Sequence, residues 1–170
     1  QRGHDLWIAA RQFHRVLVSV VGFHHREHEE QDRGDETTDQ QHREQAAAAH
    51  RQSHLLAGPA ILDELRARHV RLYALSNWSA ETFPVALQRY PFLGWFDGIV
   101  ISGEVGAAKP DVRIFQELID RHEIEPPATV FVDDNEPNVT AAAAMGFIAL
   151  RFHEAQRLRE DLEGLGLLEG

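Results

Sequence analysis

The sequence predicts an α/β fold in which a Rossmann-like, doubly wound parallel sheet is covered by helices on both faces. Two observations predict it. From residue 55 onward, short apolar runs alternate with segments whose apolar residues recur at helical spacing. The short runs are apolar throughout, as is typical of strands that are buried on both faces of a sheet. The expected strands cover residues 70–75, 98–102, 129–132 and 147–150.

Each expected strand is next to a segment that carries helix signals. Ser79 is placed to cap a helix that runs to about Arg89, and Asp111 is placed to open another, which the prolines at 126–127 should end. Gly146 is expected to end a third. The expected helices cover residues 60–66, 79–89, 111–125, 137–145 and 154–165.

The composition changes near residue 54. Residues 1–54 contain eight of the 11 histidines, and residues 24–54 have almost no large apolar side chains, too few to order that stretch alone. We therefore expect a His/Gln-rich N-terminal segment, residues 1–54, that is partly helical or disordered, and an α/β core at residues 55–170. His24 and His28 would share one helix face and could bind a metal, but no third ligand accompanies them, so a polar tract is favoured.

The bulk composition limits the partners. A net charge of −10 argues against nucleic acid, because binding to phosphate backbones needs clustered Lys and Arg. The absence of cysteine excludes disulfides and thiol chemistry and fits a reducing cytoplasm. The apolar run from Val16 to Phe23 is too short to cross a bilayer. We expect a cytoplasmic protein without nucleic-acid or membrane partners.

Lys109 is the only lysine of the chain, against sixteen arginines. It lies between a Gly/Ala turn and a proline. The lysine ammonium is compact and can reach a small anion, whereas arginine carries a planar fork of donors. Codon usage could have removed lysine from the chain and left this one by chance, or the position could need an ammonium. The residues around Lys109 favour the second interpretation.

Polar residues follow the expected strands where each strand ends. Because the carboxyl ends of parallel strands meet at one edge of the sheet, we expect these side chains to converge. Each one alone is ordinary turn or cap chemistry. Together, a hydroxyl, an ammonium and two carboxylates suit a phosphate and a Mg²⁺ ion. The residues are Ser76, Asn77, Lys109, Asp133, Asp134 and Asn138.

Three stretches, 75–79, 103–111 and 130–138, resemble the second, third and fourth motifs of the haloacid dehalogenase (HAD) superfamily, in order and at similar spacing. The resemblance covers about residues 55–168. It implies a Rossmann-like core and hydrolase activity, since the members are mostly phosphatases, with dehalogenases among them.

The resemblance also implies roles for the individual residues. Ser76 would bond the substrate phosphoryl group, and Lys109 would steady the phosphoryl group and the nucleophile. Asn77, next to Ser76, is also expected to bind the substrate. Asp133 and Asp134 would bind Mg²⁺, and Asn138 would brace the Asp loop.

The acidic pair favours one subclass. The metal-independent 2-haloacid dehalogenases of the family typically lack this pair, whereas the phosphatases keep it. A Mg²⁺-dependent phosphatase that acts on a small phosphorylated metabolite is therefore expected, with a 2-haloacid dehalogenase-like hydrolase as the alternative.

The first motif of the family is an apolar strand that ends in Asp-x-Asp, and the first Asp of this motif is the nucleophile. We find no such motif in this sequence. The upstream apolar run at 15–23 ends without a carboxylate, although residues 16–21 can still fill the central place in the sheet. Three explanations are open. A truncated or frame-shifted enzyme is favoured, followed by a non-catalytic phosphate-binding relative and by an enzyme with an unrecognised group. We expect impaired activity.

Overall fold

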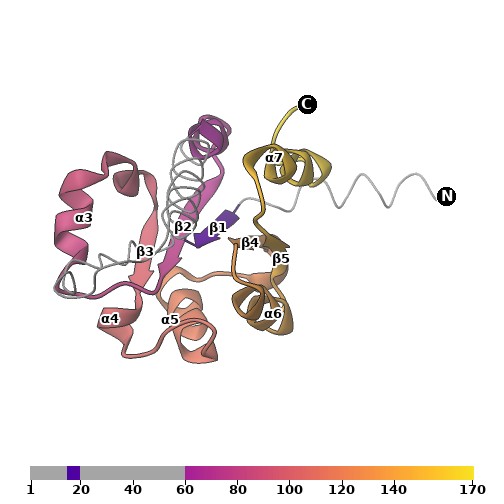
Figure 1. The fold of residues 1–170 in the computed structure, drawn as a ribbon. Helices are drawn as coiled ribbons and strands as arrows, with labels where there is room; N and C mark the ends of the chain where they lie inside the picture. Colours follow the sequence, from indigo (N-terminus) through magenta and orange to yellow (C-terminus); the bar gives the residue numbers. More distant parts are fainter. Residues whose placement is uncertain (1–14, 20–59) are drawn as a thin grey trace, which may run out of the picture.

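The structure, a computed structural model, describes residues 15–19 and 60–170 of the chain. In this part, one parallel sheet lies between two layers of helices (Figure 1). The expected α/β fold with a doubly wound parallel sheet is therefore confirmed.

The sheet has five parallel strands in the order β3-β2-β1-β4-β5. The chain starts at the centre, winds to one edge and then returns to build the other half, so all carboxyl ends lie along one rim. The strands are β1 (Arg15–Ser19), β2 (Arg71–Ser76), β3 (Gly98–Ile101), β4 (Thr129–Asp133) and β5 (Ile148–Arg151).

The central strand β1 comes from the N-terminal third of the chain. Ser19 is in register with Leu75 of β2, and Val18 is in register with Val132 of β4. The expectation that residues 16–21 fill the central place is confirmed for the residues in β1. The rest of that run, and most of residues 1–54 with His24 and His28, lie outside the described residues.

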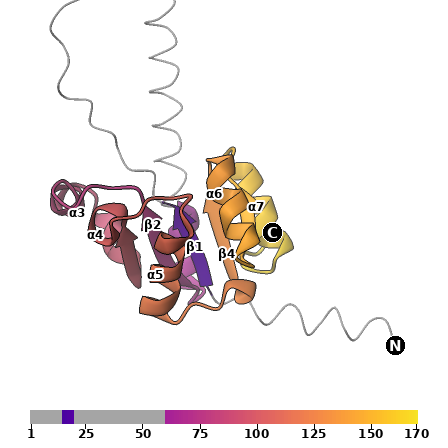
Figure 2. The same cartoon turned by 90° about the horizontal axis from the view of Figure 1, so that it is seen from below.

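Helices cover both faces of the sheet, because alternate strand side chains point to opposite sides. On one face, Tyr73 and Phe131 pack against α5 (Val112–His122) and α6 (Glu136–Ala144). On the other face, Leu72 and Val130 pack against the helical residues 60–67 and against α7 (Ala155–Gly164) (Figures 1 and 2).

Short helical elements cover the β3 edge of the sheet and form connections between the strands. Trp78, Leu93 and Ile101 form a third buried cluster under α3 (Phe83–Arg89) and the 3₁₀ turn η1 (Pro91–Trp95). A single helical turn, α4 (Ser102–Val105), follows β3 directly, and the 3₁₀ turn η2 (Pro126–Ala128) precedes β4. Within the described ranges, no helix is long and apolar enough to span a membrane.

The predicted cap at Ser79 is wrong. Helix α3 begins at Phe83, with Thr82 before it and no side-chain cap hydrogen bond. The Thr82 hydroxyl instead accepts a hydrogen bond from the Trp78 indole at 3.0 Å, and the Ser79 hydroxyl accepts from the Glu81 N–H at 3.2 Å. Residues 79–82 therefore form a turn, in which the Ser79 side chain serves a neighbouring amide.

The predicted cap at Asp111 is confirmed, because its carboxylate accepts a hydrogen bond from the Arg113 N–H at 2.9 Å. The predicted end of this helix is too late. Helix α5 ends at His122, because Glu123 adopts the left-handed conformation with a φ of 51°. The prolines at 126–127 begin η2 instead of ending α5.

The His122 ring packs near the amino ends of β2 and β3, at the end of the sheet opposite the rim. Its ring lies 5.2 Å from the Tyr73 ring, centroid to centroid. It also lies against Gly98, where a Cβ atom would be only 2.2 Å from the ring. Burial, followed by the positive charges of Arg121 and Arg71, lowers the pKa of His122, and Asp97 opposes this shift.

This arrangement predicts a pH-dependent stability. As the pH falls through the ordinary histidine value of 6.5, the unfolded chain binds a proton at His122 before the folded protein does. The free energy of unfolding should therefore decrease from that value down to the lowered pKa of the folded state and then level off. Urea unfolding of the wild type and of His122→Gln at a series of pH values checks this, because the variant should lose that part of the slope. Equal slopes in the two proteins would contradict it.

Candidate active site

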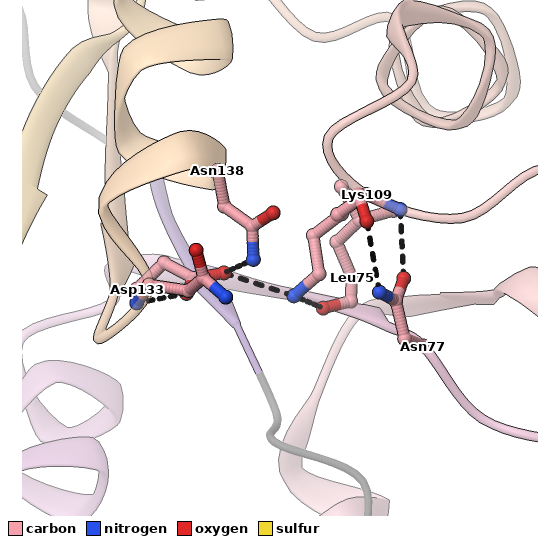
Figure 3. A network of polar contacts seen from close by, with 6 residues as sticks. Leu75, Asn77, Lys109, Asp133 and Asn138 are labelled. Carbon is pink, nitrogen blue, oxygen red and sulfur yellow. Dashed lines mark hydrogen bonds and ion pairs between the residues drawn. The ribbon is translucent and has the colours of Figure 1, made fainter.

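The centre of the rim is a buried ion pair between Lys109 and Asp133. The Lys109 Nζ lies 3.0 Å from the Asp133 Oδ2, and the two side chains are 3% and 1% exposed (Figure 3). The same ammonium donates a hydrogen bond to the Leu75 carbonyl at 2.8 Å. Burial lowers the pKa of Lys109, and the Asp133 carboxylate opposes that shift. A cation is therefore held at the ends of β2 and β4.

Within the described part of the chain, three donors hold the Asp133 carboxylate. Its Oδ2 accepts from the Lys109 ammonium and, at 2.9 Å, from the Asn138 side-chain amide. Its Oδ1 accepts from the Asn135 N–H at 2.8 Å. Asn138 is buried in the first turn of α6, so this helix and the loop before it hold the carboxylate toward Lys109.

The neighbouring acid, Asp134, has a different environment. Asp133 is the last residue of β4 and is buried, whereas Asp134 follows the strand and is exposed. Among residues 15–19 and 60–170, no group of three or more His, Cys, Asp or Glu side chains could hold a metal. Mg²⁺, however, needs only one or two carboxylates when water and phosphate oxygens complete its shell. An exposed carboxylate beside a fixed acidic residue fits such an ion, with Asp134 as the side chain that can reach it.

The loop that carries Lys109 is held from the end of β2. The Asn77 side-chain oxygen accepts a hydrogen bond from the Lys109 N–H at 2.7 Å, and the Asn77 amide donates to the Lys109 carbonyl at 3.0 Å (Figure 3). The next residue, Trp78, accepts at its carbonyl from the Gly103 N–H at 2.9 Å and from the Ser102 hydroxyl at 3.2 Å. Two consecutive residues therefore hold both ends of segment 102–109.

Two serines stand at the ends of the inner strands. Ser76 is the last residue of β2 and is buried. Ser19 is the last residue of β1 and is in register with Leu75 of β2, and Val18 before it is in register with Val132, the residue before Asp133. The backbone of position 19 thus lies between the strands that deliver Ser76 and Asp133.

Sequence reasoning missed position 19. The family's first motif predicts a carboxylate at the end of this strand, and the residue there is a serine, directly after the apolar run 16–18. The signal was present in the sequence, since Ser19 is the first polar residue after that run, as Ser76 and Asp133 are after theirs.

The structure brings most of the predicted site residues to one place. Ser76, Asn77, Lys109, Asp133 and Asn138 come together at the rim, although the Asn77 amide is engaged by the main chain of Lys109. Asp134 lies beside them at the surface. The rim thus combines a buried ammonium–carboxylate pair with an exposed carboxylate next to it.

The chain belongs to the haloacid dehalogenase-like hydrolase family, whose family model matches residues 1–146. The match includes β1 and the three motif-bearing segments after β2, β3 and β4. With the strand-end geometry, it defines the class of the protein as a HAD-type hydrolase.

Two relatives show the range of this class. The sesquiterpene phosphatase astK of Aspergillus oryzae is 30% identical over 96 residues, which cover 56% of this chain and 49% of that protein. The (S)-2-haloacid dehalogenase 1 of a Pseudomonas species is 28% identical over 99 residues, which cover 58% of this chain and 44% of that protein. The chain thus spans about half the length of these relatives.

A crystal structure has a similar fold. An uncharacterised protein from Corynebacterium glutamicum superposes with a TM-score of 0.60, covering 93% of this chain and 98% of that one. The sequence identity is 23%, so this likeness concerns the architecture alone.

Proposed function

We propose that this protein is a HAD-type phosphatase of the cytoplasm that binds Mg²⁺ and a small phosphorylated metabolite at the strand-end rim. The observation that carries the proposal is the buried Lys109–Asp133 ion pair, with the exposed Asp134 directly beside it. A fixed ammonium suits phosphoryl oxygens, and an exposed carboxylate suits the divalent cation that accompanies them. The likeness to the Aspergillus phosphatase agrees with this choice.

The chain's own residues would contribute mainly by preorganisation. Lys109 is already oriented by the Leu75 carbonyl and by Asp133, so it needs no rearrangement when an anion arrives. Ser76, at the end of β2, is proposed to bond the phosphoryl group. Asp134 would hold Mg²⁺, which when bound would neutralise charge on the phosphoryl oxygens.

Turnover is proposed to be slow because of position 19. The resemblance places the attacking aspartate at the end of the central strand, and in this chain that strand ends at Ser19. The groups proposed for phosphate and Mg²⁺ are present, whereas position 19 has a hydroxyl in place of the nucleophilic carboxylate. Binding should therefore be better preserved than hydrolysis.

The proposed metal role predicts the effect of Asp134→Asn. The variant should lower Mg²⁺-dependent hydrolysis of p-nitrophenyl phosphate, and Mg²⁺ affinity measured by calorimetry, by about tenfold to a hundredfold. Asp120→Asn is the matched control, because it removes an exposed carboxylate on α5, a different element from the one that carries Asp134. If both variants keep the wild-type Mg²⁺ affinity, Asp134 is not the metal ligand.

A second candidate is a binding module without turnover, and the serine at position 19 favours it. In that case phosphate and Mg²⁺ together would raise the melting temperature by mass action, while no phosphate ester is cleaved. Measurable Mg²⁺-dependent hydrolysis that Asp134→Asn removes would exclude this candidate.

The dehalogenase alternative has support from the Pseudomonas relative. The exposed carboxylate of Asp134 counts against it, since a metal-independent reaction has no use for that group. Release of halide from a 2-haloacid, without release of phosphate from any ester, would favour the dehalogenase.

A further inference from the structure

Asn77 makes contacts that differ from those expected of a substrate-binding residue. Its amide oxygen and nitrogen are both bonded to the main chain of one residue, Lys109, which lies 32 positions away in sequence. Both bonds, at 2.7 and 3.0 Å, are of ordinary length. Figure 3 shows the amide facing the Lys109 backbone, on the opposite side from the ammonium.

The backbone of Lys109 determines where its ammonium can go. From that anchor the side chain extends to the Leu75 carbonyl and to Asp133. Leu75 is two residues before Asn77, so one strand end holds Lys109 both at its main chain and at its ammonium. At the other end of the loop, Gly103 is so close to the 78–80 segment that a Cβ atom would be 2.3 Å from the Ala80 nitrogen. The loop between them therefore has little freedom to shift.

We propose that Asn77 is a positioning residue that acts through Lys109: its two-point amide bridge sets the place of the ammonium in the phosphate site. The placement itself follows from the contacts, and only its consequence for phosphate rests on the proposed function. Asn77 thus makes no contact with substrate, and its loss acts on the site only when Lys109 is present.

The single lysine allows a direct measurement. Protein grown with isotope-labelled lysine gives one side-chain ammonium signal, that of Lys109. In the wild type the signal should be sharp, because the ammonium is buried and hydrogen-bonded. In Asn77→Ala it should shift or broaden beyond detection. Asn77→Asp, which keeps the size and the acceptor but loses the donor, should change it in the same direction. Gln116→Ala, which removes an exposed side-chain amide on α5, is the control and should leave it unchanged.

A double-mutant cycle then tests the consequence for the site. With inorganic phosphate and Mg²⁺ as the probe, Asn77→Ala should weaken binding about tenfold in the wild-type background and not at all in Lys109→Met. A residue that only supports the fold would lower the melting temperature in both backgrounds without this non-additivity. A substrate-contacting Asn77 would weaken binding equally in both.

The outcomes separate the two proposals. An unchanged ammonium signal in folded Asn77→Ala and Asn77→Asp overturns the positioning role, as does an equal loss of phosphate affinity in both backgrounds. An altered signal in a protein whose wild type does not bind phosphate supports the positioning role and contradicts the proposed function. An altered signal together with a non-additive loss of affinity supports both.

Discussion

Replacing Lys109 by methionine is expected to lower the free energy of unfolding by about 3–5 kcal/mol. Methionine fills a similar volume, so the cost arises from Asp133, which keeps its charge in a place where its side chain is 1% exposed. Among the described residues, the other side-chain and main-chain donors to the Asp133 carboxylate, from Asn138 and Asn135, are neutral and cannot replace the lost cation. Urea unfolding monitored by circular dichroism measures the change.

Two further variants separate this effect from a general loss of charge. Adding Asp133→Asn to Lys109→Met should recover part of the stability, because the buried carboxylate charge that lost the Lys109 ammonium is then removed. Arg113→Met breaks the exposed ion pair with Asp111, whose partners are 70% and 38% exposed, and should cost less than about 1 kcal/mol. A cost for Lys109→Met no larger than that for Arg113→Met would mean that the buried pair is not an important support of the fold.

Replacing Ser19 by aspartate is expected to create a phosphoryl acceptor at the end of the central strand. Position 19 is in register with Leu75, whose carbonyl accepts a hydrogen bond from the Lys109 ammonium, and it follows Val18, which is in register with Val132. A carboxylate there would be next to the proposed phosphate site, where it would attack the phosphorus of the ester, break the ester P–O bond and release the alcohol or phenol, leaving an aspartyl-phosphate. Incubation with a labelled phosphate ester and Mg²⁺ should then leave acid-stable, base-labile label on Ser19→Asp and none on the wild type.

A second carboxylate should be needed to complete the reaction. The family's Asp-x-Asp pattern, laid on this chain, puts the second acid at position 21, where the sequence has valine. The double variant Ser19→Asp, Val21→Asp is expected to hydrolyse p-nitrophenyl phosphate faster than Ser19→Asp by about 10²-fold to 10⁴-fold, the range supplied by one positioned proton-transfer group. Ser19→Asn is the control without a nucleophilic carboxylate. A Ser19→Asp variant that binds phosphate but forms no phosphoenzyme would show that position 19 does not face the site.

The sequence predicted the sheet because buried strands leave a strong pattern. Runs such as 129–132 are apolar throughout, and the first polar residue after each run marks a carboxyl end. Parallel strands bring those ends to one rim, so Lys109 and Asp133 could be placed together before any contact was known. The fold and the residues at the rim follow from this single regularity.

The contacts within the site depend on packing that no local pattern encodes. Asp133 and Asp134 are identical in sequence terms, and only the end of β4 decides that one is buried and the other exposed. The bridge from Asn77 to Lys109 joins residues from two different loops. The Ser79 cap failed because the Trp78 indole engages the Thr82 hydroxyl, a contact that sequence spacing did not reveal.

The most direct test of the phosphate site is the melting temperature of the wild type with inorganic phosphate and Mg²⁺, separately and together. At a hundredfold excess over the dissociation constant, binding to the folded state alone adds about 2.7 kcal/mol to the free energy of unfolding. We expect a rise of several degrees with both ligands present, retained in Asp120→Asn and lost in Asp134→Asn. A wild-type melting temperature that does not respond to phosphate and Mg²⁺ would contradict a phosphate site at the Lys109–Asp133 pair.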